Sequence, residues 1–410
     1  MAPKTTKRRS PHEGGAYSYT TRGGTLWYWK ATITGPDGTA KPRVKRGYPT
    51  KQAALAGLRE ALSASAKGGF TEPSKQPFGD YLATWLDSLR LAPSTIASYR
   101  KNVRLHISPN IGSVPLASLT PVTLDKLYRQ LEHDGRADHR SGEGLSLRTV
   151  RYVATIISAA LRDAVEQGLI PANPASRAHP PTARQAKSPE MHPWTEEELK
   201  DTFLPWSAAN SEHHVAWWTL SHTGMRRGEL LELRWRDVDL AAGTIAVRRS
   251  AGIVRNKGEG ATVEVGTTKT GVSRTIAVDA GTVALLKSWK SERAGIGLHL
   301  VRPDSLVFSD IEGRHLHPER FSRTFQNTLA RCRKEHPELP VIRLHDLRHS
   351  HLTILLRKRV PVKAVSKRAG HASGVVTMTV YAGWMPADDA DAAAVFAERP
   401  ADKVRADDAL

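Results

Sequence analysis

The sequence predicts a multidomain, mainly α-helical protein in three parts: a small three-stranded β-sheet with one helix, an α-helical domain, and a mixed α+β domain with a small antiparallel sheet. Three observations lead to this prediction. The length of 410 residues exceeds what one hydrophobic core usually supports. Apolar residues alternate with a period of two near the N-terminus and recur at helical spacing through residues 75–175. Beyond residue 195, helical stretches flank short strand patterns.

The first domain is predicted at residues 1–70. Residues 17–48 contain three alternating stretches with a turn at residues 35–38, which indicates two hairpins and hence a three-stranded sheet. Thr50 is a suitable N-cap for a helix that runs to the glycine pair at residues 68–69.

The second domain is predicted at residues 75–175 and is helical. One helix opens at Ser94 after a proline, and another opens at Thr120 with Pro121 in its first turn. A long amphipathic helix begins at Ser146, and its apolar stripe is Val150, Val153, Ile157, Ala160, Leu161 and Ala164. A further helix is expected before Pro93. Residues 176–194 are rich in proline and lack periodicity, which predicts an extended linker.

The third domain is predicted at residues 195–410. Strand patterns at residues 244–249, 261–268 and 273–278 lie among helical stretches, and they form the expected small antiparallel sheet. The tail after residue 381 contains an apolar run at residues 392–396. This run is typical of a short helix that either packs on its own domain or docks on a neighbouring copy.

Charge points to nucleic acid as a partner. The net charge is +19, and residues 1–70 alone hold 13 Lys or Arg against 3 acidic residues. A basic sheet can place its strands in a DNA groove, which makes the third strand a candidate binding element; the alternative is a solvated basic surface without a specific ligand. Candidate DNA-binding residues are Arg43, Lys45, Arg46, Tyr99 and Lys101.

Other features of the composition indicate a soluble protein of the cytoplasm, associated with the nucleoid. No stretch of about 18 apolar residues is present, and the basic N-terminus is not followed by an apolar segment. Cys332 is the only cysteine, which excludes an internal disulfide and a Cys-rich zinc site. No membrane partner, metal site or cofactor is therefore expected.

Four short segments of the third domain carry chemically active residue types. A Thr-Gly turn places an arginine at a helix start, a lysine lies between two strand patterns and is expected at a hairpin tip, a His-x-x-Arg pair shares a helix face, and a Gly-His is followed by a tyrosine. Each segment alone is typical of ordinary structure, such as an exposed lysine or a packed tyrosine. The active groups, in order, are Arg226, Lys269, His345, Arg348, His371 and Tyr381.

This ordered set resembles the catalytic signature of the tyrosine recombinase family, also called the phage integrase family. The resemblance spans roughly residues 195–390, and the preceding parts are similar to the helical core-binding and three-stranded arm-binding domains of integrases. It implies a site-specific DNA recombinase that cuts and rejoins DNA through a covalent 3′-phosphotyrosine, and so integrates or excises a mobile element such as a phage or plasmid. It also implies action on double-stranded attachment sites by four protomers, with an accessory excisionase or DNA-bending protein.

The residue types suit this chemistry. A tyrosine can store a phosphodiester as an ester, and Tyr381 is the only tyrosine beyond residue 195. Arg226 and Arg348 can hold the non-bridging oxygens, and Lys269 can protonate the leaving 5′ oxygen. The resemblance implies that His345 helps to deprotonate the tyrosine and that a second histidine, His371, donates a hydrogen bond to the phosphate.

Several alternatives remain. A type IB topoisomerase-like enzyme uses a similar set of residues, and a DNA-binding regulator would lack catalysis. A metal-dependent nuclease would need clustered carboxylates, of which only Glu229 and Asp346 lie near these segments. His349 is four residues from His345, but no further ligand accompanies the pair, so we expect His349 and His351 to have a packing role. The chain departs from the family pattern at Ala369, where leucine is usual, and directly after Tyr381, where many members have a nearby histidine.

Overall fold

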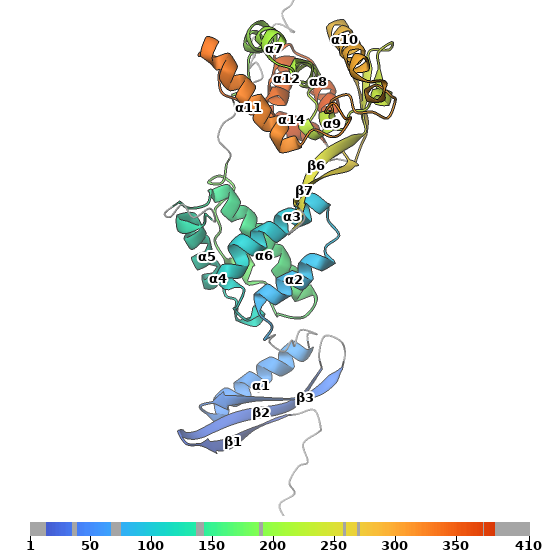
Figure 1. The fold of residues 1–410 in the computed structure, drawn as a ribbon. Helices are drawn as coiled ribbons and strands as arrows, with labels where there is room; N and C mark the ends of the chain where they lie inside the picture. Colours follow the sequence, from blue (N-terminus) through green and yellow to red (C-terminus); the bar gives the residue numbers. More distant parts are fainter. Residues whose placement is uncertain are drawn as a thin grey trace, which may run out of the picture. The chain divides into compact units, whose positions relative to one another are not determined.

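A computed structural model describes residues 14–34, 39–66, 75–136, 143–187, 192–256, 260–268, 271–371 and 373–381. The chain divides into two compact units, Met1–Pro189 and Glu190–Leu410. The protein is mostly helical with small antiparallel sheets, as the sequence predicts (Figure 1). Among the residues described, no helix is both long enough and apolar enough to cross a membrane. The predicted apolar run at residues 392–396 lies outside the described residues.

The N-terminal sheet and its helix form as predicted. Strands β1 (Gly15–Thr21), β2 (Gly24–Thr34) and β3 (Ala40–Tyr48) are antiparallel in the order β1-β2-β3, and helix α1 (Lys51–Ala66) covers one face (Figure 1). Alternate residues of β2 pack against the helix and form a small core of Trp29, Ala31, Ile33, Leu58 and Ala61. Thr50 caps α1, since its hydroxyl accepts a hydrogen bond from Ala53 N at 3.1 Å.

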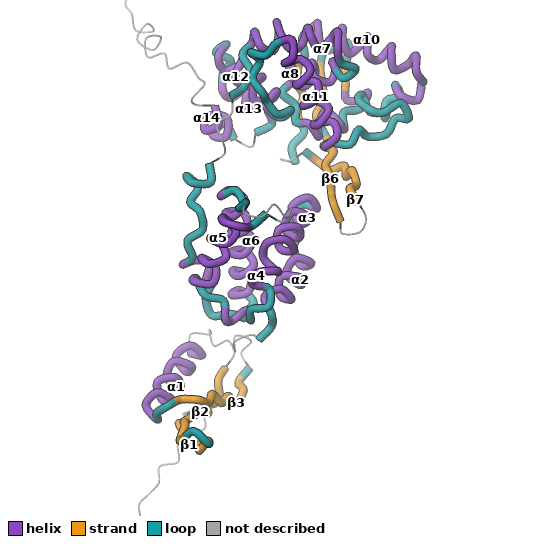
Figure 2. The backbone as a smooth tube through the Cα atoms, turned by 60° about the vertical axis from the view of Figure 1, so that its left-hand side comes forward, coloured by secondary structure: helices purple, strands orange, loops and turns teal. Residues whose placement is uncertain are grey.

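A helical bundle follows in the same unit (Figure 2). Thr120 and Ser146 cap their helices as predicted, and every member of the predicted stripe on the long helix is buried. Tyr81 Oη donates to Ala160 O at 2.8 Å, which ties the first helix of the bundle to the last. The elements are α2 (Phe78–Ser88), α3 (Pro93–Asn102), the π-helical η1 (Val103–Ile107), α4 (Ser108–Ile111), η2 (Leu116–Ser118), α5 (Pro121–Asp134), α6 (Leu147–Glu166) and η3 (Pro174–Arg177).

The start of the predicted linker packs on this bundle. Arg151 on α6 donates to Pro181 O at 2.8 Å, and Asp125 on α5 accepts hydrogen bonds from the backbone N and ring Nδ1 of His179. Pro181 is buried. Proline-rich composition predicted an extended linker at 176–194; its first part includes the end of η3 and a turn near Thr182, and polar groups of α5 and α6 hold it in place.

The second unit combines helices with two small sheets (Figures 1 and 2). Its helical elements are η4 (Glu198–Phe203), α7 (Leu204–Asn210), α8 (His214–Thr223), α9 (Arg227–Leu231), η5 (Trp235–Asp237), α10 (Ala280–Ile296), η6 (Leu298–Leu300), α11 (Pro318–Glu335), α12 (Asp346–Arg357), α13 (Val362–Ala369) and α14 (Gly374–Tyr381). One sheet has the order β4-β5-β8, from β4 (Val238–Asp239), β5 (Thr244–Val247) and β8 (Arg274–Ala277); the other pairs β6 (Arg249–Asn256) with β7 (Gly260–Thr267).

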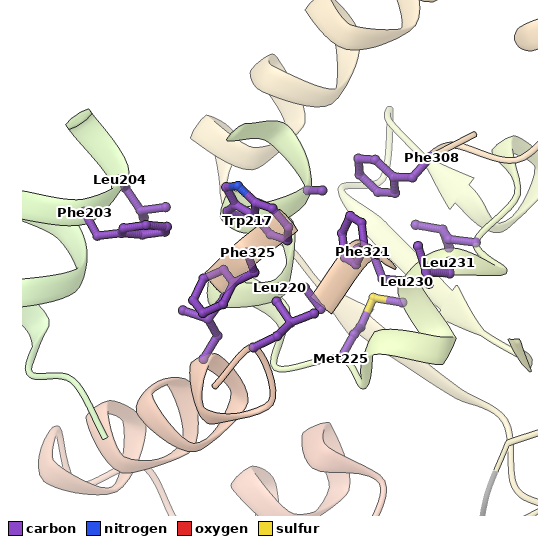
Figure 3. Packing of buried hydrophobic residues seen from close by; sticks show 14 of the residues in the cluster. Phe203, Leu204, Trp217, Leu220, Met225, Leu230, Leu231, Phe308, Phe321 and Phe325 are labelled. Carbon is purple, nitrogen blue, oxygen red and sulfur yellow. The ribbon is translucent and has the colours of Figure 1, made fainter. Parts of the chain in front are cut away.

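Two hydrophobic clusters hold this unit together. The larger contains interlocked aromatic rings from α8 and α11, with Trp217 4.7 Å from Phe321 and 5.3 Å from Phe325 (Figure 3). The smaller joins α12, α13 and α14 through Leu352, Leu356, Val365, Ala369 and Tyr381. The smaller cluster fixes the end of α14, where Tyr381 lies.

Candidate active site

Arg226 is placed by a turn that only glycine fits well. Helix α8 ends at Thr223 and is capped by Gly224, whose φ of +65° lies in the left-handed region. A Cβ at this position would lie 2.6 Å from Cδ2 of His351, so a larger residue would also clash. Met225 is buried in the core, and Arg226 then stands directly before the first residue of α9. The sequence prediction for Arg226 is confirmed in this respect.

Glu229 links Arg226 to a second arginine, Arg274 on β8. Glu229 Oε1 accepts from Arg226 Nη1 at 2.9 Å and from Arg274 Nη1 at 3.0 Å. Its Oε2 accepts from Arg226 N at 2.8 Å and Arg274 Nη2 at 2.7 Å. Burial alone would raise the pKa of Glu229, but the hydrogen bonds and charges of the two arginines bring it below its usual value. Glu229 is therefore a carboxylate that orients Arg226.

The end of α13 is held by arginines. Three consecutive carbonyl oxygens there each accept a hydrogen bond from a different guanidinium: Arg368 O from Arg274 Nε at 2.8 Å, Ala369 O from Arg348 Nη2 at 2.6 Å, and Gly370 O from Arg226 Nη2 at 3.2 Å. Carbonyls at a helix C-terminus lack intrahelical partners and attract cations. Because a guanidinium has five N–H donors, these bonds leave others for a phosphate.

Arg348 lies in the first turn of α12 and is only 4% exposed. It also donates to Gly224 O through Nη1 at 2.7 Å, which ties α12 to the turn before Arg226. Burial, with the nearby charge of Arg226, lowers the pKa of Arg348 to about 10. Arg348 thus stays protonated at neutral pH. The guanidiniums of Arg226 and Arg348 both lie at the C-terminal end of α13.

Two histidines at the start of α12 lie side by side. His345 precedes the helix and His349 is one turn further, with their rings perpendicular and their centroids 5.1 Å apart. Burial, together with the charges of His349 and Arg348, lowers the pKa of His345 to about 4. Burial also lowers the pKa of His349. Both rings are therefore neutral at physiological pH.

Tyr381 ends α14, and its side chain is buried, at 1% exposure. Its hydroxyl lies 2.6 Å from Nδ1 of His349, whereas the sequence analysis assigned the neighbouring base to His345. Burial raises the pKa of Tyr381, and the charge of Arg348 opposes this only in part. Tyr381 is therefore a protonated phenol next to a neutral imidazole.

His371 follows the left-handed Gly370 that ends α13. Its Nδ1 lies 2.7 Å from Thr377 Oγ1, which connects the start of α14 to the arginine-held end of α13. Burial and the charges of Arg348 and Arg226 lower the pKa of His371 to about 4. A neutral ring with one N–H can donate a hydrogen bond to an anion near the two arginines.

The lysine candidate, Lys269, lies outside the described residues. The strands on either side of it, β7 and β8, pair with β6 and β5 respectively and not with each other. The expectation of a hairpin tip at Lys269 was therefore wrong: its segment connects two sheets. Local alternation predicted the strands, but it did not show that β6 would be the partner of β7.

The candidate DNA-binding residues of the first unit differ in their surroundings. Arg43 and Lys45 on β3 are register partners of Ala31 and Trp29, which face α1. Arg46 instead lies over two tyrosines on the open face of the sheet, which is the face away from α1. Its guanidinium is 5.8 Å from the ring of Tyr19 and 5.7 Å from that of Tyr28.

The two candidates on α3 also differ from each other. Tyr99 stacks on Trp85 at 6.0 Å and meets Tyr152 edge-on at 5.9 Å, so its ring packs against the helical core. Lys101 is exposed. A role for either residue at DNA stays a prediction.

Sequence reasoning missed three residues that shape the site. Glu229 was considered only as a metal ligand, Arg274 was not considered, and His349 was assigned to packing. A signal for Glu229 was present, because a Glu at the third position of a helix can accept a hydrogen bond from the backbone N–H of the residue before the helix, as in a capping box. Among the described residues, no group of three or more His, Cys, Asp or Glu gathers as a metal site.

Comparison with known proteins gives consistent matches. A model described as the phage integrase family matches residues 206–384, and a model of the phage integrase N-terminal SAM-like domain matches residues 77–131. A tyrosine recombinase XerC-like protein of Caldanaerobacter subterraneus is 24% identical over 88% of this chain and 93% of its own length. A putative prophage phiRv2 integrase of Mycobacterium tuberculosis is 27% identical over 84% of this chain and 86% of its own.

Solved structures share the fold. The Tn1549 transposon integrase in complex with a circular intermediate DNA aligns with a TM-score of 0.63 at 19% identity, over 78% of this chain and 98% of that one. A lambda integrase dimer bound to a core site aligns with a TM-score of 0.53 at 17% identity, over 74% and 95%. The two family models together cover more than half of the chain and include every candidate catalytic residue. The chain therefore belongs to the phage integrase family of tyrosine recombinases.

Proposed function

We propose that this protein is a site-specific DNA recombinase that integrates or excises a mobile element, and that Tyr381 is its nucleophile. One observation carries the assignment of the site: the Tyr381 hydroxyl is buried next to Arg348 and bonded to a histidine of the same helix, α12. Phosphoryl transfer to a tyrosine needs this combination of nucleophile, cation and proton acceptor.

The proposed reaction exchanges one phosphate ester for another. Tyr381 Oη gives up its proton to a neighbouring base and bonds to phosphorus, the bond to the 5′ oxygen breaks, and a 3′-phosphotyrosine forms. Arg226 and Arg348 hold the non-bridging oxygens, whose charge grows in the transition state. Lys269 protonates the leaving oxygen. Because the phosphotyrosine keeps an ester bond to phosphorus, a different 5′ hydroxyl can later reverse the step without an external energy source.

Two histidines complete the proposed phosphate site. His345 and His371 are neutral at physiological pH, because burial and the neighbouring charges lower the pKa of each to about 4. Each neutral ring can donate one hydrogen bond to a phosphate oxygen without adding charge. The arginines therefore supply the positive charge, and the histidines add directional contacts.

The remaining parts bind DNA in this proposal. Residues 1–70 form an arm-binding domain, residues 75–175 a core-binding domain, and residues 195–410 the catalytic domain with its tail, joined by a linker at 176–194. On the N-terminal sheet, the face away from α1 carries Tyr17, Tyr19, Tyr28, Lys30 and Arg46, which pair cations with aromatic rings. Such a face suits contact with a nucleic acid backbone and bases.

Assembly follows from the chemistry. Exchange between two duplexes requires four strand cleavages, and one tyrosine per protomer implies four protomers on two sites. An accessory excisionase or DNA-bending protein would set the direction, and the enzyme would act where its substrate is, at the nucleoid. The tail beyond residue 381 is a candidate contact between protomers.

Covalent capture tests the function directly. The protein is mixed in EDTA with a pool of randomised duplexes carrying a nick, and complexes that survive SDS are recovered and sequenced. A recombinase yields one enriched sequence attached through its 3′ phosphate, and two enriched duplexes then exchange strands. A topoisomerase-like enzyme would instead relax plasmids without that sequence, and a DNA-binding regulator would leave no DNA attached after SDS.

A further inference from the structure

The hydroxyl of Tyr381 has a specific neighbour. Its Oη lies 2.6 Å from Nδ1 of His349, and within the described residues this is its hydrogen-bond partner. The ring centroids of the two residues are 5.7 Å apart. His345, the histidine to which the family resemblance assigns this proton, instead stands edge-on to the His349 ring.

The direction of this hydrogen bond follows from the two environments. Tyr381 is buried and protonated, and the ring of His349 is neutral at physiological pH, since burial disfavours the charged form of each. A neutral imidazole has one acceptor nitrogen and one N–H. The phenol therefore donates O–H to Nδ1, and the ring proton of His349 is on Nε2.

Burial lowers the pKa of His349, and one neighbouring carboxylate opposes this and favours a transient positive charge on the ring. Asp346, one turn earlier on α12, raises the pKa of His349, while Arg348 and Arg343 lower it. Arg343 keeps Asp346 ionised through three hydrogen bonds, from its N at 2.7 Å, Nη2 at 2.9 Å and Nε at 3.1 Å. The titratable and charged groups facing His349 are thus His345, Asp346 and Arg348 on α12, Arg343 before it, His371 after α13 and Tyr381 on α14.

We propose that His349 is the proton acceptor for Tyr381 in strand cleavage. The inference rests on the proposed function and adds a catalytic residue to it. As Oη bonds to phosphorus, its proton passes to Nδ1 of His349, and the electron pair of the broken P–O bond stays on the 5′ oxygen, which takes a proton from the general acid. In rejoining, the imidazolium returns the proton to Oη.

Two substitutions separate proton transfer from positioning. His349→Ala removes the acceptor, whereas His349→Asn keeps a carbonyl oxygen that can accept the hydrogen bond but takes up no proton. Single-turnover cleavage of a nicked duplex in EDTA is expected to slow by about 10²- to 10⁴-fold in both variants, with unchanged DNA affinity in a gel shift. His299→Ala, at an exposed histidine of the same unit, is the matched control and should cleave at the wild-type rate.

A substrate with sulfur in place of the bridging 5′ oxygen adds a second readout. Thiolate leaves without protonation, so this substrate restores a variant that lacks the general acid but not one that lacks the base. The His349→Ala defect should persist on this substrate. The cleavage rate of the wild type should fall at acidic pH, where Nδ1 is already protonated, and His349→Ala should lose this dependence.

Three results would overturn the proposal. They are a wild-type rate in His349→Ala, a full rate in His349→Asn, which would indicate positioning alone, or rescue of His349→Ala by the sulfur substrate. Failure of the broader function looks different: the wild type itself would then form no adduct, or the adduct would survive loss of Tyr381.

Discussion

Both carboxylate oxygens of Glu229 are held by the guanidinium of Arg274, at 3.0 and 2.7 Å, across 45 residues of sequence. The Glu229 side chain is fully buried, and that of Arg274 is 7% exposed. Because Glu229 also orients Arg226, this pair connects the stability of the fold to the geometry of the phosphate site. A buried ion pair adds little net stability relative to apolar packing, but removing one partner is strongly destabilising because it leaves an uncompensated buried charge.

We therefore expect Arg274→Met to lower the free energy of unfolding by about 3–5 kcal/mol, since it leaves a buried carboxylate with one partner fewer. Adding Glu229→Gln to Arg274→Met should recover part of this loss, because the uncompensated charge is removed. Urea denaturation of both single variants and the double variant measures the coupling. Additive effects of the two substitutions would contradict the assigned pairing.

His351 predicts a dependence of stability on pH. Its Nδ1 donates to Ser221 O at 2.8 Å and its Nε2 accepts from Arg368 Nε at 3.0 Å, and burial lowers its pKa to about 3. The unfolded chain binds this proton near pH 6.5, so the stability from the neutral ring is complete above about pH 6.5 and declines as pH falls toward 3. The slope of unfolding free energy against pH reports how many protons are bound on unfolding. His351→Gln should lower that number by up to one between pH 6 and pH 4. A slope identical to that of the wild type would exclude this role.

Gly224 and Gly243 have the same left-handed backbone conformation but different surroundings, so the two can be compared. Gly224 has φ +65° and a Cβ there would lie 2.6 Å from the His351 ring, whereas Gly243 has φ +63° and its nearest atom would be 3.4 Å away. Gly243→Ala should cost only the left-handed strain, about 1–2 kcal/mol. Gly224→Ala should cost more and slow cleavage by about 10²-fold, because Gly224 O also holds Arg348. Equal losses of stability in thermal unfolding, with normal cleavage, would show that the close contact is unimportant.

The open face of the N-terminal sheet predicts a change in the salt dependence of DNA binding. Arg46→Ala removes a cation that lies over Tyr19 and Tyr28, while Arg59→Ala removes the same charge from the exposed surface of α1. The slope of log affinity against log salt should fall by about 1 for Arg46→Ala. Arg59→Ala should keep the wild-type slope. Equal slopes for the two variants would place DNA elsewhere.

Local sequence signals predicted several helix starts and the turn that places Arg226. The caps at Thr50, Thr120 and Ser146 mark helix starts because a side-chain oxygen there bonds to the next turn, which is a property of neighbouring residues. The turn at Gly224 likewise placed Arg226 correctly.

Contacts between distant segments could not be predicted in this way. His345 and His349 are equivalent by helical spacing, and only the docking of α14 on α12 brings one of them to Tyr381. The sequence predicted a hairpin at Lys269 formed by β7 and β8, but β7 pairs with β6. Alternation within one strand does not show which other strand will pair with it.

The central claim is that Tyr381 forms the covalent bond to DNA. The direct measurement is a denaturing gel of the protein with its captured duplex, nicked and in EDTA. It compares the wild type, Tyr381→Phe and the matched control Tyr152→Phe, at an exposed tyrosine whose hydroxyl bonds to Ser98. We predict an SDS-stable adduct for the wild type and for Tyr152→Phe, and none for Tyr381→Phe despite normal DNA binding. An undiminished adduct in Tyr381→Phe would contradict the account.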